Sequence, residues 1–357
     1  MSGLTSFSPR RFSRPERLNR TTLLSQEISE QPTALAHTLL HHTGEAPDWL
    51  SEMLANVARV RILGTGSSQH AAQAGSWLIE DWAGVPVDVE NAAEERDRPR
   101  LLRGEHELVI GITRMGEAAD TLAAMRAARA QGTPVLAITD GSGHRVARDA
   151  DAILLTGAGL EISGAATKTF TCQLATLGAL ALRLAEAHHV PWHVVGKLER
   201  RLREWPDVIA HTLDVTREPV GLLAHRLAKA DRFLFVGRGA ALPIAREGSL
   251  KFQEVAQVPA DVRAGGDLKD TVLTPGMPII AIATAVLPKL LDDLGEARAR
   301  GGRVIAIASE RDTELFEHAD EVIWLPTADL ATASVAAAVP LQLLAHDVAT
   351  LRTVAVA

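Results

Sequence analysis

Tyrosine is absent from this chain of 357 residues, and cysteine occurs once, as Cys172. A single cysteine excludes an internal disulfide framework and fits the reducing environment of the cytoplasm. The absence of tyrosine removes that side chain as an acid, a base or a stacking platform in any site. No apolar run reaches the length that we expect of a membrane-spanning helix, so we expect no membrane partner.

Basic residues are also fewer than acidic ones. The sequence has 44 acidic against 37 basic residues, a net charge of −7, and 46% of its residues are apolar. Nucleic acids favour basic surfaces, so this balance argues against a nucleic-acid partner. The length and the apolar fraction suit two or three packed domains.

The first twenty residues hold five arginines and little that packs into a core. Pro9 and Pro15 interrupt any amphipathic helix there, which argues against a transit peptide, and no apolar segment typical of a secretion signal follows. We therefore expect a disordered tail over residues 1–21 and a helical segment over 22–50.

Short apolar strands alternate with helical stretches along the rest of the chain. In the first half the strands are expected within residues 57–68, 107–116, 133–140 and 151–157. The second half restates them as "RFLFVG", "MPIIAIA", "RVIAIAS" and "EVIWLPT". Apolar strands separated by helices indicate a parallel sheet that is covered on both faces.

The two halves repeat each other at a nearly constant offset. Val236 lies 173 positions after Leu63, and Ile280 lies 170 positions after Ile110. A period this long indicates a duplicated domain rather than a solenoid. The sequence therefore predicts an α/β fold of two tandem doubly wound domains, each with a three-layer α/β/α arrangement, over residues 51–191 and 219–357. A helical connector is expected over 192–218.

Doubly wound sheets bind ligands beyond the carboxyl ends of their strands. Hydroxyl groups and glycines gather at these ends mainly in the first half, at residues 64–68 and 113–118. The sequence therefore predicts the ligand there, with a lid or catalytic groups from the second half.

Four segments of the chain are specific enough to compare with known families. They are "GSS" at 66–68, "AGVPVDVENAAEER" at 83–96, "GLEISGAATKTFTCQL" at 159–174 and "GRGAALPIAREGSLKFQE" at 237–254. These segments resemble the sugar isomerase (SIS) family, and most closely the isomerase half of glucosamine-6-phosphate synthases and the stand-alone glucosamine-6-phosphate deaminases. The resemblance covers residues 24–346.

The resemblance implies a hexose or hexosamine 6-phosphate ligand and a cytoplasmic homodimer with active sites between subunits. The phosphate is expected at helix N-termini, whose free N–H groups favour an anion. The implied substrate-binding residues are Gly66, Ser67, Ser68, Thr113, Arg114, Met115, Gly116, Ala118, Gly164 and Ala165. For Ser67 and Ser68 the alternative is a simple N-cap role.

The loop at 113–118 departs from the family's usual Ser-x-Ser-Gly-x-Thr. Thr113 and Gly116 keep the first hydroxyl and the backbone approach, whereas Met115 and Ala118 lack the other two hydroxyls. Arg114 offers a guanidinium that could bind phosphate, sulfonate or carboxylate in their place. The alternative is that Arg114 faces solvent or pairs with Glu117.

The resemblance places the catalytic base at Glu254, with Lys251 and Glu247 on the same helix face. Glu247 and Lys251 also form an (i, i+4) pair, so an ordinary surface salt bridge is the alternative. Asp270, in "DLKDTVL", stands where the family's synthase has a ring-opening histidine, and the chain lacks that enzyme's terminal lysine. Asp270 is therefore a departure within the expected catalytic set.

We expect neither a metal nor an organic cofactor. His41–His42 and His188–His189 are adjacent pairs, which do not share a helix face. His70 could touch a sugar, with a helix-surface position as the alternative, and "GTGSS" and "GRG" are too short for a dinucleotide fingerprint.

The expected activity is conversion of a hexosamine 6-phosphate to a ketohexose 6-phosphate and ammonia. The alternatives are isomerisation or deglycation of another anionic sugar, and a regulator that binds sugar phosphate without turnover.

Overall fold

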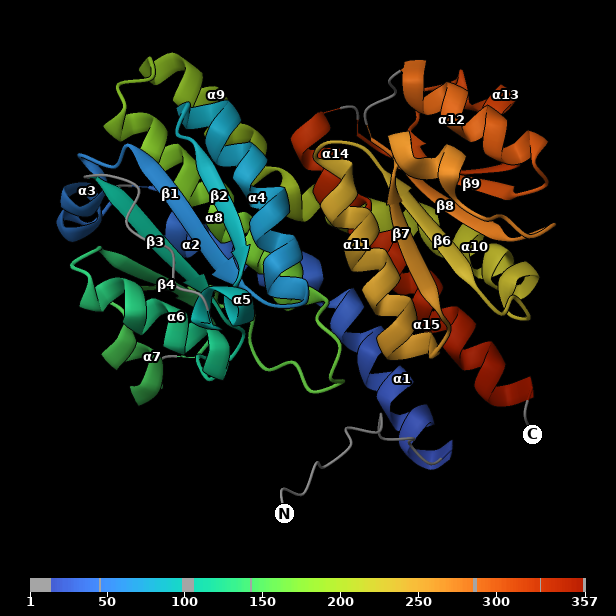
Figure 1. Ribbon diagram of the computed structural model, residues 1–357, viewed down its shortest axis with the longest axis horizontal. Helices are drawn as coiled ribbons and strands as arrows, with labels where there is room; N and C mark the ends of the chain where they lie inside the picture. The colour runs from blue at the N-terminus through green and yellow to red at the C-terminus, as the bar shows by residue number, and fades with distance from the viewer. Residues whose placement is uncertain are drawn as a thin grey trace.

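The computed structural model describes residues 14–44, 46–97, 106–141, 143–284, 288–327 and 329–355. Two α/β domains lie side by side, the first in blue to green and the second in yellow to red (Figure 1). Each holds one parallel five-stranded sheet with helices on both faces, which confirms the predicted fold class.

The first sheet has the strand order β2-β1-β3-β4-β5. Its strands are β1 (Arg59–Gly64), β2 (Val87–Asn91), β3 (Glu107–Ile112), β4 (Val135–Thr139) and β5 (Ala152–Leu155). Its helices are α4 (Ser67–Ala83), α5 (Ala92–Asp97), α6 (Ala119–Ala130), α7 (His144–Asp149) and α8 (Lys168–Ala187). In this doubly wound order, ligands bind beyond the carboxyl ends of the strands where the winding reverses.

The second sheet repeats the topology, because its order β10-β9-β8-β6-β7 is the first order read from the other edge. Its strands are β6 (Phe233–Gly237), β7 (Ala260–Ala264), β8 (Pro278–Ala283), β9 (Arg303–Ser309) and β10 (Glu321–Leu325). Its helical elements are α11 (Ala241–Lys251), the π-helical turn η1 (Phe252–Ala256), the 3₁₀ turn η2 (Gly265–Asp270), α12 (Pro288–Ala299), α13 (Leu315–His318), α14 (Leu330–Ala336) and α15 (Ala338–Ala355).

The edge strands β2 and β7 are missing from the sequence prediction. Their segments, "VDVEN" and "ADVRA", carry charged residues and are only partly buried. Each pairs with the first strand of its domain, β2 with β1 and β7 with β6. An edge strand covered on one side has no continuous apolar run, so the pattern used for the inner strands does not detect it.

Helices outside the two sheets frame the domains. They are α1 (Arg14–Ser29), α2 (Gln31–His42), α3 (Asp48–Leu54), α9 (Trp192–Arg203) and α10 (Trp205–Leu227). Residues 1–13 of the predicted tail lie outside the described residues. Helix α1 begins at Arg14, inside the predicted tail, and Pro15 falls in its first turn, where a missing N–H costs no helical hydrogen bond.

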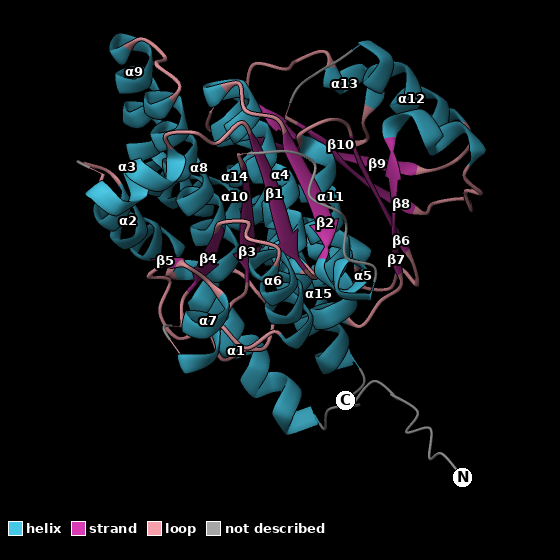
Figure 2. Ribbon diagram, turned by 60° about the vertical axis from the view of Figure 1, so that its left-hand side comes forward, coloured by secondary structure: helices cyan, strands magenta, loops and turns pink. Residues whose placement is uncertain are grey.

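Alternation along the strands divides the interior into three cores. In β1, Val60 and Ile62 face the central core, whereas Leu63 faces the outer core beneath α6. In β6, Phe233 and Phe235 face the same central core, and Leu234 faces a separate outer core. The inner faces of both sheets therefore share one core with the helices between them, as the strands enclosed by helices in Figure 2 illustrate.

From the sequence we expect no apolar run long enough to span a membrane. By the test of length and composition alone, this expectation is wrong. Among the described residues, the stretch Leu330–Val354 meets that test, with a mean hydropathy of 1.3 over its most apolar window. However, 78% of that window is buried inside the protein. The apolar side chains of α14 and α15 are therefore part of the central core, which joins the two domains.

Candidate functional site

The candidate site lies where the start of α4 meets the end of α11. Helix α4 begins directly after Gly66, whose φ of 55° is a conformation that glycine adopts without strain. Helix α11 runs antiparallel to α4, because Gly66 lies near Leu250 and Gly239 lies near Trp77. Glu247 of α11 therefore contacts Ser67 and His70. Charged groups from the second domain thereby reach the predicted ligand end of the first.

Glu247 and Lys251 are the centre of a network that joins the two domains. Glu247 accepts a hydrogen bond from Ser67 at 2.9 Å and lies 2.8 Å from Nδ1 of His70. Lys251 Nζ lies 3.1 Å from Glu247, 3.2 Å from Ser67 Oγ and 2.6 Å from Glu254. All three ammonium protons of Lys251 therefore have acceptors.

Glu247 and Lys251 form a buried ion pair rather than an exposed one. The side chains of Lys251 and Glu247 are only 1% and 2% exposed, so the surface salt bridge considered from the sequence is wrong. Burial by itself raises the pKa of Glu247, but Lys251, His70 and Ser67 outweigh it and hold that pKa below its ordinary value. Burial likewise lowers the pKa of Lys251, but Glu247 and Glu254 outweigh it and raise that pKa. Both groups are therefore charged at neutral pH.

Glu254 differs from Glu247 in its access to solvent. Its side chain is 37% exposed, and it projects from the π-helical turn η1, a feature that often marks functional sites. A carboxylate that is held by a buried ammonium and open on its other side can accept a proton from a bound molecule. The geometry is therefore compatible with the base role that the resemblance implies, and that role remains a prediction.

His70 is the residue that the sequence analysis undervalued. Its side chain is 17% exposed and pairs with buried Glu247 rather than standing on a helix surface. Because Glu247 is ionised, His70 Nδ1 carries the proton of this contact, which leaves Nε2 as the second ring nitrogen for other partners. Glu247 lies 177 positions away, and the only signal for the contact was that His70 follows the first Gly/Ser turn.

Ser67 and Ser68 do not cap α4 with their side chains. The N-cap is Gly66, and no side-chain capping bond is made there, so the N-cap alternative is wrong. Ser67 donates to Glu247, whereas Ser68 accepts from Gln173 at 3.2 Å and keeps its own proton. Ser68 is therefore the freer donor for an anion at this turn.

The loop at 113–118 is held tightly against the next strand. Asp140 N donates to the Arg114 carbonyl at 2.9 Å, and a Cβ at Gly116, where φ is 70°, would lie 3.0 Å from the Gly141 carbonyl oxygen. Thr113 is buried and accepts from Ala118 N at 3.4 Å, which leaves its hydroxyl proton unused in that bond. Met115 is 45% exposed.

Arg114 approaches Glu161 rather than Glu117, the protein partner considered from the sequence. Its Nη1 lies 3.8 Å from Oε2 of Glu161, and its side chain remains 38% exposed. Glu161 Oε1 accepts from the N–H and the hydroxyl of Thr167 at the start of α8. The loop at 157–167 is thus braced by a buried carboxylate, and the pairing of Arg114 with Glu117 is wrong.

Gly164 and Ala165 lie in that braced loop. Gly164 is exposed with φ of 90°, whereas the side chain of Ala165 is buried. Only the backbone of Ala165 can therefore face a ligand.

Asp270 stands apart from the other predicted catalytic residues. It ends η2 and lines a surface hollow of about 520 Å³ together with Arg246 and Arg263. Within one chain it has no described contact with Glu247, Lys251 or Glu254. As for metals, the described residues contain no group of three or more His, Cys, Asp or Glu side chains that could hold an ion.

Comparison with known proteins places this arrangement in a family. The SIS domain model matches residues 53–183 and 226–352, one copy in each half. The chain therefore belongs to the SIS domain family, which confirms the resemblance.

Among the relatives, a glutamine–fructose-6-phosphate aminotransferase (isomerizing) of Mycobacterium tuberculosis is 36% identical over 343 residues, which cover 92% of this chain and 55% of that protein. The chain thus spans about half the length of the curated relatives it matches. The C-terminal domain of glucosamine-fructose-6-phosphate aminotransferase from Francisella tularensis superposes with a TM-score of 0.87 at 29% identity, over 92% of this chain and 96% of that one. Glucosamine-6-phosphate deaminase from Thermotoga maritima shares the fold, with a TM-score of 0.72 at 18% identity over 92% and 95% of the two chains.

Proposed function

We propose that this protein is a sugar-phosphate aldose–ketose isomerase that also releases ammonia, converting a hexosamine 6-phosphate to a ketohexose 6-phosphate. The observation that carries the proposal is the half-open carboxylate of Glu254, held at 2.6 Å by the buried ammonium of Lys251. Relatives named glutamine–fructose-6-phosphate aminotransferase and glucosamine-6-phosphate deaminase support the choice of substrate.

The reaction needs one base that faces two neighbouring carbons. In the opened sugar, Glu254 takes the proton from C2 to give an enolamine and returns a proton to C1 to give a ketimine. Water then adds to C2, and ammonia leaves. One water is consumed for each ammonia released, and no oxidation or reduction takes place.

Lys251 acts in this scheme as a positioning residue. Its protons are already directed at Glu247, Ser67 and Glu254, so it fixes the base without reaching the sugar. The positive charge beside Glu254 also offsets the two carboxylates, since an uncompensated pair would favour protonation of one of them. Lys251 therefore holds the Glu254 carboxylate in place while its other side stays open to a bound sugar.

The sugar's anion is assigned to the N-terminal ends of α4 and α6. Both helices present backbone N–H groups there without a side-chain cap. Ser68, Thr113 and Arg114 supply the side-chain donors, and the hydroxyl groups that the family usually has at positions 115 and 118 are missing. We expect weaker phosphate binding than the family's usual loop gives.

A second candidate is a regulator that binds sugar phosphate without turnover. It is favoured by the separation of Asp270 from Glu254 within one chain and by the engagement of Ser67 with Glu247. In that case the site would bind the sugar but move no proton.

The two candidates are distinguished by assays on a panel of hexosamine 6-phosphates, in which ammonia and fructose 6-phosphate are measured. The proposed function predicts equal amounts of both products from at least one substrate. A parallel test incubates fructose 6-phosphate in D₂O and follows its C1 protons by NMR. Exchange of C1 protons for deuterium without any release of ammonia from the hexosamine 6-phosphates would indicate a plain isomerase. Binding of the sugar phosphate without such exchange would indicate the regulator.

A further inference from the structure

The two domains are related by an approximate two-fold axis that exchanges α4 and α11. A Cβ at Gly66 would lie 3.9 Å from Leu250 Cδ2, and a Cβ at Gly239 would lie 3.6 Å from Trp77 Cη2. Gly239 stands 173 positions after Gly66, and Leu250 stands 173 positions after Trp77. The φ values of the two glycines, 55° and 53°, also agree. The contact at one end of the helix pair is therefore repeated at the other end.

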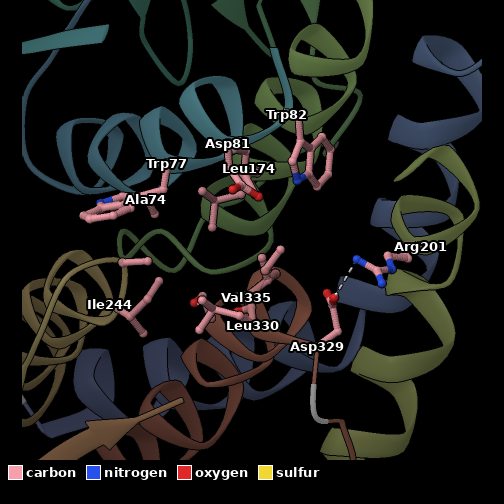
Figure 3. A pocket seen from close by; sticks show the side chains of 14 residues that line it. Ala74, Trp77, Asp81, Trp82, Leu174, Arg201, Ile244, Asp329, Leu330 and Val335 are labelled. Atoms are coloured by element: carbon pink, nitrogen blue, oxygen red, sulfur yellow. Dashed lines mark hydrogen bonds and ion pairs between the residues drawn. The ribbon is translucent and has the colours of Figure 1, made fainter. Parts of the chain in front are cut away.

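A cavity of about 350 Å³ lies at that other end, between the domains. Figure 3 shows Trp77, Asp81 and Trp82 of α4 on one side of it and Ile244, Leu330 and Val335 on the other. The volume falls within the range of small-molecule sites.

This cavity is the duplicated counterpart of the candidate active site. Positions 173 before Glu247, Lys251 and Glu254 are Ala74, Leu78 and Asp81, and all three line it. Ala240, the counterpart of Ser67, lines it as well. The same places in the duplicated fold thus form a polar site at one end of the helix pair and an apolar cavity at the other.

Charge distinguishes the two sites. The active-site helix has two carboxylates around one lysine, whereas the counterpart keeps only the acid, Asp81, in the place of Glu254. Arg201 and Asp329 also line the cavity and lie 3.3 Å apart, so these two charges compensate each other. In the part of the chain that the structure describes, Asp81 makes no ion pair or hydrogen bond. Asp81 is exposed, so its carboxylate adds one negative charge at the solvent-facing edge of the cavity.

We propose that this cavity, lined by Ala74, Trp77, Leu78, Asp81 and Trp82 on the α4 side, is a second ligand site that binds an aromatic or aliphatic amine. The apolar walls accept the body of the ligand, and Asp81 pairs with its ammonium group. The indoles of Trp77 and Trp82 add apolar area to these walls. A sugar phosphate is disfavoured, since the lysine and the serine hydroxyl of the active site have become Leu78 and Ala240.

The test uses 2-naphthylmethylammonium and its neutral analogue 2-naphthylmethanol in calorimetric titrations of the full chain near neutral pH. We expect the ammonium compound to bind with a Kd on the order of 0.1–1 mM, as for a small fragment, and more tightly than the alcohol. Because Asp81 is exposed, Asp81→Asn should weaken the ammonium compound by roughly two- to fivefold and leave the alcohol unchanged. Asp292→Asn, a change of the same kind on exposed α12, should affect neither.

A variant that fills the cavity provides the second arm. Ala331 also lines the cavity. Ala331→Leu should abolish binding of both probes while the melting temperature stays close to that of the parent. No binding of either probe at millimolar concentration, or equal effects of Asp81→Asn and Asp292→Asn, would overturn the proposal. Neither titration depends on turnover, so failure here is distinguishable from failure of the proposed function.

Discussion

Arg246 donates a hydrogen bond from Nη1 to Oε1 of Gln73 at 2.6 Å, and these two residues stand 173 positions apart. They are therefore each other's counterparts in the duplicated fold, and their bond lies on the approximate two-fold axis between α4 and α11. Glu247, Lys251 and Glu254 follow Arg246 by the same steps by which Ala74, Leu78 and Asp81 follow Gln73. One helix pair thus carries the candidate active site at one end and the apolar cavity at the other.

Replacing Glu254 tests the base. Glu254→Gln should lower kcat by roughly 10²–10⁴-fold, the usual contribution of a general base, and leave the Kd of the sugar phosphate nearly unchanged. Steady-state kinetics and calorimetric titration provide the two values. Activity within about tenfold of the parent would remove Glu254 from this role.

The buried pair is tested by a double-mutant cycle. Lys251→Met leaves Glu247 buried without its ammonium partner and should cost about 3–5 kcal/mol of the free energy of unfolding. Adding Glu247→Gln removes the orphaned charge, so the double variant should be more stable than Lys251→Met alone. Urea denaturation measures each variant, and additive costs would show that the two side chains are not coupled.

The pH dependence of stability follows from the same two groups. The pKa of Glu247 is lowered on folding, so its contribution is present above its ordinary value of 4.5 and is lost as the pH falls through the lower folded value. The pKa of Lys251 is raised, so its contribution is present below 10.5 and is lost as the pH rises through the higher folded value. Glu247→Gln should therefore flatten the acid side of a plot of melting temperature against pH. An acid side as steep as that of the parent would contradict this assignment.

The altered loop is tested at Arg114. Arg114→Ala should weaken a phosphorylated sugar by roughly tenfold or more, the scale of one charge-assisted hydrogen bond, and leave the neutral sugar unaffected. Met115→Ser with Ala118→Thr should strengthen phosphate binding if phosphate is the natural anion. Because Ala118 is the N-cap of α6 and has no capping side chain, Ala118→Thr should also raise stability by about 1 kcal/mol. Unchanged anion affinity in Arg114→Ala would leave Ser68 and Thr113 as the side-chain donors.

Assembly is the remaining expectation. Asp270 is far enough from Glu254 to make no described contact in one chain, so it could join an active site only from a second copy. We expect a homodimer by light scattering at assay concentration, with the 267–270 segment near the partner's site. A monomer that turns over substrate would contradict this expectation.

The amino-acid sequence was enough to predict the duplicated fold. Strand and helix patterns are local, and four apolar strands in each half are enough to specify a parallel sheet with two covered faces. Helical spacing likewise placed Glu247, Lys251 and Glu254 on one face. The edge strands β2 and β7 escaped this reasoning because an uncovered side relaxes the apolar pattern.

The contacts that these residues make depend on the tertiary structure. Ser67 and His70 contact Glu247 across about half the chain, and no local pattern encodes such a contact. The same packing buries Lys251 and turns an (i, i+4) pair into a charged core that holds Glu254. The offset of 173 was visible in the sequence, but the cavity at the far end of α4 and α11 is formed by side chains of both domains and follows from no local pattern.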